Sequence, residues 1–245
     1  MMNNIKCFSL ILFFLVSCSS SDQQLIDGNK LITPQYEFSA EFFECNLNEG
    51  YTLLNLESFI SSLTRSKLSI DEKIYDVGVF FPNSDFENKF MINLKNYSNN
   101  NIYELFLNEI STRGFDQIAS CNFEQNNFKG LSLISSIAEN DKSSHSVEIL
   151  RCVYNNGFNY GSFRVAIDRF NITMEALNIP YEALYLVKNN DEDEFTWINN
   201  FYVDNYSDLI SSEWISMQVA EDIKQEFSEN AKCVDAKSYN VFYFL

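Results

Sequence analysis

The chain has 245 residues, a formal net charge of −17 and 46% hydrophobic residues. This length allows one large domain or two domains of about 100 residues, and the apolar content is sufficient for a packed core rather than disorder. So acidic a surface repels phosphate backbones, which excludes nucleic acid as an expected partner.

The first 17 residues have the parts of a secretory signal peptide. Lys6 supplies positive charge, and the apolar stretch from Phe8 to Val16 is too short to span a bilayer, which needs about 20 residues. The run Leu15-Val16-Ser17-Cys18 resembles the lipobox of bacterial lipoproteins. That resemblance implies cleavage before Cys18 and lipid attachment to its sulfur. The alternative is an ordinary signal peptide with an incidental cysteine.

Residues 18–35 are expected to form a lipidated tether, because the run after Cys18 is polar and short of packing residues. Ser19, rather than Asp, follows the lipidated position, which resembles the pattern of proteins sorted to the outer membrane. We therefore expect a cell-envelope protein at the periplasmic face of the outer membrane. Its contact with the membrane should come from the N-terminal lipid alone.

The next hundred residues, 36–137, read as strand, helix, strand, strand, helix, strand. Hydrophobic periodicity and turn residues predict strands at 36–45, 74–81, 89–95 and 129–135, and helices at 52–63 and 101–113. Residues 138–145 are polar and are expected to link this segment to the next.

Residues 146–245 repeat the same order. Here the patterns predict strands at 146–153, 181–187, 195–202 and 239–245, and helices at 162–177 and 207–227.

The two segments are related by an offset of 107 residues. Under it Cys45, Asn48 and Gly50 coincide with Cys152, Asn155 and Gly157, and the apolar faces of the first helices coincide as well. Two agreeing signals favour a tandem duplication over a chance alignment of Asn- and Phe-rich sequence.

The βαββαβ order is typical of ferredoxin-like domains. Several strands are apolar on both faces and therefore need cover on both sides. Helices can cover one face of each sheet, and the sheet of the second repeat can cover the opposite face. This arrangement resembles the dimeric α/β-barrel superfamily, which includes antibiotic-biosynthesis-monooxygenase-like domains, with both subunits fused in one chain. The resemblance implies two sheets packed face to face and a monomeric, pseudo-dimeric protein. The alternative is two ferredoxin-like domains side by side without a shared barrel.

Four cysteines remain after Cys7 leaves with the signal peptide and Cys18 is lipidated. In an oxidising compartment an even number predicts disulfides. The first and last strands of a ferredoxin-like unit are antiparallel neighbours, so the strand order predicts one bond in each repeat: Cys45 with Cys121, and Cys152 with Cys233.

Matching positions on the third strand of each repeat are candidate ligand-binding residues. Phe90 corresponds to Trp197, and Asn93 corresponds to Asn200. On each strand the aromatic residue and the Asn lie three residues apart, so the aromatic pair and the Asn pair should point to opposite faces of the sheet. An Asn amide inside an apolar barrel could orient a ligand, whereas the simpler interpretation is that it satisfies backbone groups. Trp197 and Trp214 both lie in the second repeat, which could therefore hold a pocket that the first has lost.

No pattern predicts a catalytic residue, a metal site or a cofactor. His145, the single His of the chain, is expected to be a solvated linker residue, which argues against zinc, a Ser-His-Asp triad and haem. The acidic run Asp191 to Glu194 lacks the spacing of a calcium loop and is expected to be a solvated turn.

The resulting hypothesis is an envelope protein that binds a small apolar or aromatic molecule or has a structural or interaction role. The alternative is a cofactor-independent monooxygenase-like or isomerase-like enzyme. An interior pocket with polar groups would favour binding or catalysis.

Overall fold

The computed structural model describes residues 36–65, 75–83, 88–98, 101–124, 126–134, 144–177, 181–188, 193–202 and 218–243. The signal peptide, the Cys18 lipid site, the tether, most of the expected linker, residues 189–192 of the acidic turn, and Trp214 lie outside the described residues. Below, repeat 1 means residues 36–134 and repeat 2 means residues 144–243.

Repeat 1 has the predicted order of strands and helices, with two short additions before its last strand. Its elements are β1 (Tyr36–Leu47), α1 (Leu53–Arg65), β2 (Tyr75–Pro82), β3 (Lys89–Asn96), α2 (Ile102–Thr112), α3 (Phe115–Ile118), β4 (Ala119–Cys121) and β5 (Phe128–Ile134). Gly114 ends the second helix as predicted, with a left-handed φ of 81° that a side chain would strain.

Repeat 2 follows the same order, but its first and last strands are longer than predicted. Its elements are β6 (Ser144–Tyr154), α4 (Tyr160–Leu177), β7 (Tyr181–Lys188), β8 (Glu194–Phe201), α6 (Gln218–Asn230) and β9 (Ala231–Tyr243). The last strand therefore begins at Ala231 rather than at Tyr239. His145 belongs to β6 and is only 7% exposed, so the expectation of a solvated linker residue is wrong. It pairs in the sheet with Val241 of β9, which draws the residue into the barrel.

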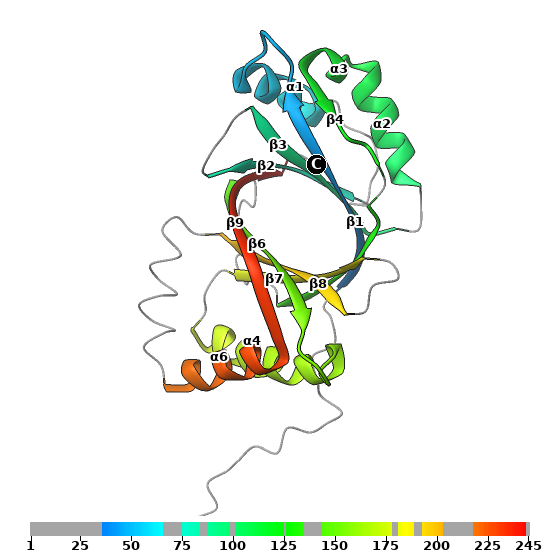
Figure 1. Ribbon diagram of the computed structural model, residues 1–245. Coiled ribbons are helices and arrows are strands. Elements are labelled where there is room, and N and C mark those ends of the chain that lie inside the picture. The colour runs from blue at the N-terminus through cyan, green and yellow to red at the C-terminus, as the bar shows by residue number, and fades with distance from the viewer. Residues whose placement is uncertain are drawn as a thin grey trace, which may run out of the picture. The chain divides into compact units, whose positions relative to one another are not determined.

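All strands among the described residues belong to one antiparallel sheet that closes on itself. The order is β3-β2-β9-β6-β8-β7-β5-β1-β4. Because β3 also pairs with β1, the strands from β3 to β1 close into a barrel, and short β4 remains beside β1 (Figure 1). Within each repeat the order is that of a ferredoxin-like unit. The expectation of two separate sheets packed face to face is wrong. Strand β5 pairs with β7 and β9 pairs with β2, so backbone hydrogen bonds join the two repeats at two places.

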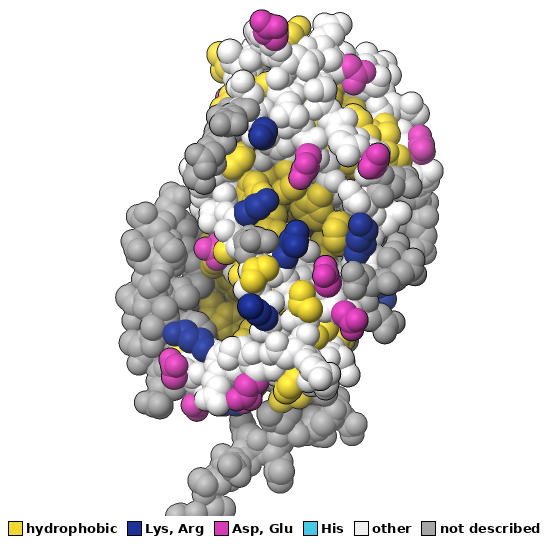
Figure 2. All heavy atoms as spheres, in the orientation of Figure 1, with side chains coloured by type: hydrophobic (Ala, Val, Ile, Leu, Met, Phe, Trp, Pro, Cys, Tyr) yellow, Lys and Arg dark blue, Asp and Glu magenta, His cyan; other side chains and the backbone are white. Residues whose placement is uncertain are grey.

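Strand alternation divides the hydrophobic core into three layers. One cluster fills the barrel, where it includes Phe38, Phe80 and Leu184. A second lies between the outer face of repeat 1 and helices α1 to α3, and a third lies between the outer face of repeat 2 and helices α4 and α6 (Figure 1). In the same orientation, hydrophobic side chains gather across the middle of the molecule with Lys and Arg side chains among them (Figure 2).

The duplicated Cys-Asn-Gly positions have the same structural role in both repeats. Gly50 and Gly157 have φ values of 86° and 88° in the turn after the first strand. The structure bonds Cys45 to Cys121 and Cys152 to Cys233, the pairs that the strand order predicts. No described helix is long and apolar enough to cross a membrane.

Candidate functional site

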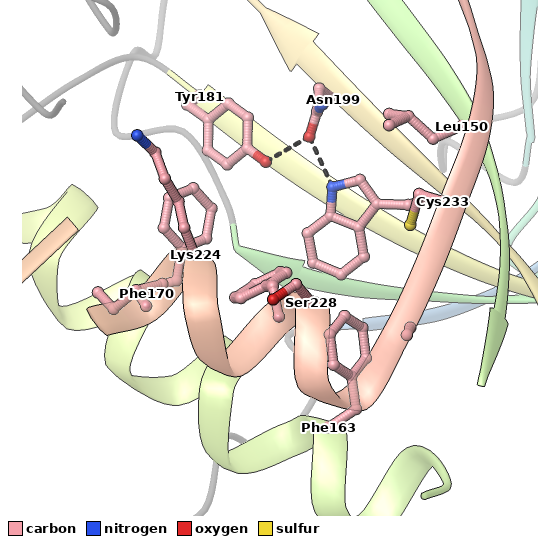
Figure 3. A pocket seen from close by; sticks show the side chains of 12 residues that line it. Leu150, Phe163, Phe170, Tyr181, Asn199, Lys224, Ser228 and Cys233 are labelled. Atoms are coloured by element: carbon pink, nitrogen blue, oxygen red, sulfur yellow. Dashed lines mark hydrogen bonds between the residues drawn. The ribbon is translucent and has the colours of Figure 1, made fainter. Parts of the chain in front are cut away.

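A cavity of about 350 Å³ lies between the outer face of repeat 2 and helix α6 (Figure 3). We call it the helix-side cavity. All of its lining comes from repeat 2: Leu150, Phe163, Phe170, Tyr181, Trp197, Asn199, Ile223, Lys224, Phe227, Ser228, Ala231 and Cys233. Ligand cavities in proteins are typically of about 300–1,000 Å³ and mostly apolar, and this one meets both criteria.

Five of the twelve residues that line the helix-side cavity are aromatic. Phe227 of α6 lies at the centre of these rings. Its ring centroid is 5.0 Å from that of Phe163, 5.7 Å from that of Phe170 and 6.0 Å from that of Trp197. Each of these pairs meets edge to face, the geometry that aromatic quadrupoles favour. The rings are therefore held in place by one another, so the wall is preorganised for an apolar or aromatic ligand.

The amide of Asn199 is a polar group in this wall, besides the hydroxyl of Tyr181 and the side chains of Lys224 and Ser228. Its Oδ1 accepts hydrogen bonds from the hydroxyl of Tyr181 and from the indole Nε1 of Trp197, both at 2.6 Å (Figure 3). Its Nδ2 faces Glu148 Oε2 at 3.4 Å. The amide thereby fixes the orientation of Trp197, whose ring lines the cavity.

A second cavity, of about 340 Å³, lies at one end of the barrel interior. We call it the barrel-end cavity. It is lined by four tyrosines, two carboxylates and one ammonium: Tyr36, Asp76, Lys95, Tyr97, Glu182, Tyr202 and Tyr243. The charged residues are buried and the tyrosines are half-buried.

Glu182 is the centre of a hydrogen-bond network that joins the two repeats. Its Oε1 accepts from Tyr36 at 2.5 Å and Ser132 at 3.5 Å, and its Oε2 accepts from Tyr202 at 2.6 Å and Asn200 at 3.1 Å. Both oxygens of the Glu182 carboxylate therefore accept hydrogen bonds. Burial and the neighbouring Glu182 together raise the pKa of Tyr36 and Tyr202, so both phenols stay protonated and keep donating.

Lys95 carries the positive charge of the barrel-end cavity. Its Nζ lies 5.5 Å from the ring centroid of Phe38 and 5.1 Å from that of Tyr243, within cation–π range. Burial acts to lower the pKa of Lys95, but the oxygens of Tyr243 and Glu182 outweigh it and raise the pKa above its usual value. The side chain therefore remains an ammonium ion inside the barrel.

The four predicted ligand-binding residues do not form one site. Trp197 lines the helix-side cavity, whereas Phe90 is buried in the helix-side core of repeat 1. Asn93 and Asn200, each 1% exposed, face the barrel interior, opposite to the aromatic pair. Asn93 donates to the backbone oxygen of Glu41 at 3.1 Å, while Asn200 joins the Glu182 network.

Sequence reasoning missed Asn199 and all the charged residues of the barrel-end cavity. Asn199 follows Trp197 by two residues on a strand, which places both on one face, and that spacing could have identified it. Lys95, Asp76 and Glu182 come from three different strands and share no motif.

His145 does not fit a haem ligand in the helix-side cavity. Its Nε2 lies 3.2 Å from Asn200 Oδ1, and its ring packs 4.5 Å from Tyr202 and 5.5 Å from Tyr243, inside the barrel. Because the chain has a single His, that cavity has no histidine nitrogen to offer an iron. Among the residues that the structure describes, no three His, Cys, Asp or Glu side chains gather as a metal site.

Comparison with solved structures identifies the fold. The chain is similar to a candidate monooxygenase from Lactobacillus acidophilus (TM-score 0.53, 10% identity, 84% of this chain and 95% of the other). It is also similar to a candidate monooxygenase from Fusobacterium nucleatum (TM-score 0.52, 12% identity, 86% of this chain and 94% of the other). A third similar structure is a chlorite dismutase mutant from Candidatus Nitrospira defluvii (TM-score 0.50, 8% identity, 83% of this chain and 90% of the other). No family model and no curated protein sequence matches. The chain thus shares with these structures an α+β fold with an eight-stranded antiparallel barrel, and the similarity extends to the fold alone.

Proposed function

We propose that this is a lipid-anchored envelope protein that binds a small aromatic or apolar molecule in the helix-side cavity. The observation that carries the proposal is the wall of interlocked rings around Phe227, open to a ligand and held by Asn199. Burying about 100 Å² of a ligand's apolar surface there contributes about 2.5 kcal/mol, so even a single aromatic ring gains appreciable affinity.

The binding proposal is tested with the form that lacks residues 1–18. Aromatic, aliphatic and lipid-like compounds are screened by thermal shift and by the fluorescence of Trp197, in a Trp214→Phe background that leaves one indole. Aromatic compounds should raise the melting temperature and change the emission of Trp197. A flat response across all three classes would refute the proposal.

A matched pair of variants locates the ligand. Ser228 lies on α6 at the cavity and is exposed, so Ser228→Phe should fill the entrance without disturbing the core. Gln225 is exposed on the same helix and is not part of the lining, so Gln225→Phe is the control. We expect Ser228→Phe to weaken binding about tenfold or more and Gln225→Phe to leave it unchanged.

The membrane part of the proposal is supported by the lipobox resemblance around Cys18. Cys18→Ala should move the protein from the membrane fraction to the soluble fraction of the cell, and should abolish labelling by a radioactive fatty acid. Retention in the membrane by the variant would contradict lipid anchoring.

The second candidate is a cofactor-independent monooxygenase-like or isomerase-like enzyme. Structural similarity to two candidate monooxygenases favours it. A monooxygenase without a cofactor needs an electron-rich substrate, because the substrate itself must reduce oxygen. Oxygen uptake with the aromatic compounds that bind, abolished by Ser228→Phe, would support catalysis; binding without turnover would support the first candidate.

A further inference from the structure

A third and smaller cavity, of about 180 Å³, lies on the outer face of repeat 1 where helix α2 begins. We call it the repeat 1 cavity. Strands β1 and β3 and the first residues of α2 supply most of its lining. It shares no lining residue with the helix-side cavity or the barrel-end cavity, so it is independent of the function proposed above.

The carboxylate of Glu41 lines the repeat 1 cavity and lacks a hydrogen-bond partner. Glu41 is only 9% exposed, and its buried Oε2 accepts no hydrogen bond from the residues that the structure describes. Burial raises the pKa of Glu41, as expected for a carboxylate that has lost water without gaining a donor. A buried acceptor without a partner costs free energy. A ligand that supplies the missing donor would account for it.

Repeat 2 shows how the same carboxylate is satisfied when a polar neighbour is available. Glu41 aligns with Glu148 under the 107-residue offset, and Glu148 faces Asn199 across the sheet. Asn199 Nδ2 donates to Glu148 Oε2 at 3.4 Å. The residue across from Glu41 is Leu94, which has no polar side-chain group to donate. Repeat 1 therefore lacks this internal partner and has a cavity beside the carboxylate instead.

The start of α2 brings hydrogen-bond donors to the same cavity. Asn101, Ile102 and Tyr103 line it, and the first N–H groups of a helix have no acceptor within the helix. The side chain of Asn101, directly before the helix, makes no capping hydrogen bond to them. The exposed amides of Asn101 and Asn127 add groups that both donate and accept. The cavity thus combines a charged acceptor with several donors.

This combination favours one class of ligand over others. A simple anion would meet Glu41, and the net charge of −17 would repel it as well. A simple cation would meet the positive end of the α2 dipole and N–H groups that need an acceptor. A hydroxyl group satisfies both partners, because it donates one hydrogen bond and accepts others. Leu94 and Ile102 add an apolar surface for the C–H groups of a ring.

We propose that the repeat 1 cavity binds a small neutral molecule with adjacent hydroxyl groups, such as a monosaccharide or another cyclic polyol. One hydroxyl donates to Glu41, and its neighbour accepts from the first N–H groups of α2. The volume of about 180 Å³ is below the range of about 300–1,000 Å³ that is typical of drug-sized ligands, so the bound unit is a single ring.

Nuclear magnetic resonance titrations of the form that lacks residues 1–18 test the ligand class. They compare cis-cyclohexane-1,2-diol with cyclohexanol, and glucose, N-acetylglucosamine and myo-inositol extend the series. Acetate and methylammonium serve as the simple anion and cation. We expect at least one compound with adjacent hydroxyls to shift the amide signals of Ile102 and Tyr103 and to bind about tenfold more tightly than cyclohexanol. Ser228→Phe, which fills the entrance of the helix-side cavity, should leave this binding unchanged.

Glu41→Gln separates a binding role from a structural one. The substitution keeps the shape of the side chain but removes the charge, so it should weaken binding of the hydroxyl compound about tenfold or more. Without ligand it should leave the melting temperature unchanged or raise it, because an unpartnered buried charge is lost. A carboxylate with a structural role would instead lower the melting temperature when replaced. Glu57→Gln, at an exposed position of α1, is the control and should change neither property.

Several outcomes would overturn the proposal. They are binding of cyclohexanol as tight as that of every compound with adjacent hydroxyls, a response to acetate or methylammonium alone, and no shift of the α2 signals by any compound. Normal binding by Glu41→Gln would also overturn it. If Glu41→Gln does not fold, the comparison of diol with alcohol in the unmodified protein decides.

Discussion

The ring of Phe38 covers Gly130 on the neighbouring strand. The two residues are partners in the β1–β5 register and both face the barrel interior. A Cβ atom on Gly130 would lie 2.4 Å from the Cε2 and Cζ atoms of Phe38, closer than any side chain permits. The glycine is therefore required for the close approach of the ring, and not for a turn.

Gly130→Ala should destabilise the protein by about 1–3 kcal/mol, because the added methyl group forces the Phe38 ring out of a packed core. Urea unfolding measures the effect. In a Phe38→Ala background the same methyl group has room, so the cost of Gly130→Ala should largely disappear. An equal cost in both backgrounds would show that the ring is not the obstacle.

The disulfides should each lie within one repeat. Cys45 and Cys121 are 76 residues apart and Cys152 and Cys233 are 81 apart, and in the chain-entropy model closing loops of that size contributes about 4 kcal/mol each. Replacing either pair by alanine should lower the free energy of unfolding by about this amount. Mass spectrometry of an unreduced digest checks the pairing, and a peptide that joins the two repeats would contradict it.

Asn48 and Asn155 should contribute equally to stability. Asn48 Nδ2 donates to the backbone oxygens of Asp116 and Gln117, at 2.9 and 3.0 Å. Asn155 Nδ2 donates to those of Ser228 and Glu229, at 2.8 and 2.9 Å. Each amide thus satisfies carbonyls near the end of the last helix of its repeat.

Asn48→Ala and Asn155→Ala are each expected to cost about 1–2 kcal/mol in chemical unfolding, because two hydrogen bonds are lost. Asn108→Ala, at an exposed position of α2, changes the same residue type without touching these carbonyls and shows whether any Asn→Ala change has this effect. Strongly unequal costs at Asn48 and Asn155 would argue against a common structural role.

Alkaline conditions should destabilise the protein through its tyrosines. Burial raises the pKa of Tyr36 and Tyr202, and it raises the pKa of Tyr185 to about 12. In the unfolded chain these phenols lose their protons near pH 10, while in the folded chain they keep them. The stabilisation is therefore complete below about pH 10 and is lost as the pH rises from there through the pKa values of the folded state.

Urea midpoints measured across this range should fall with increasing pH, and the part of the phenolate absorbance that Tyr185→Phe removes should rise together with unfolding rather than before it. Tyr185→Phe, which cannot ionise, should reduce the slope. Titration of Tyr185 near pH 10 while the protein remains folded would contradict the expectation.

Much of the fold could be predicted because local patterns and the duplication agreed. The 107-residue offset aligned cysteines, turn glycines and helix faces, and each of these depends on nearby sequence. The closed barrel was missed because the pairing of β5 with β7 and of β9 with β2 joins strands that are distant in sequence. His145 was misplaced since its polar neighbours resemble a linker, and its burial depends on pairing with β9.

The candidate sites were less predictable than the fold. An aromatic pocket in repeat 2 could be anticipated from Trp197, but a sequence does not show which rings leave space between them. The barrel-end cavity depends on Asp76, Lys95 and Glu182 facing inward from separate strands. Each of them reads in the sequence as an ordinary exposed charge, and only the closure of the barrel brings them together.

Fusion of the two repeats into one polypeptide permits an asymmetry that two identical chains could not have. In a symmetric homodimer every residue near the two-fold axis meets its own copy, so a lysine placed there is matched by a second lysine. Here the 107-residue offset aligns Lys95 with Tyr202 rather than with a second lysine, and Glu182, the acid that acts on Lys95, belongs to repeat 2. A single buried lysine can thus lie among unlike neighbours, and either half can acquire a new chemistry while the other keeps the architecture intact.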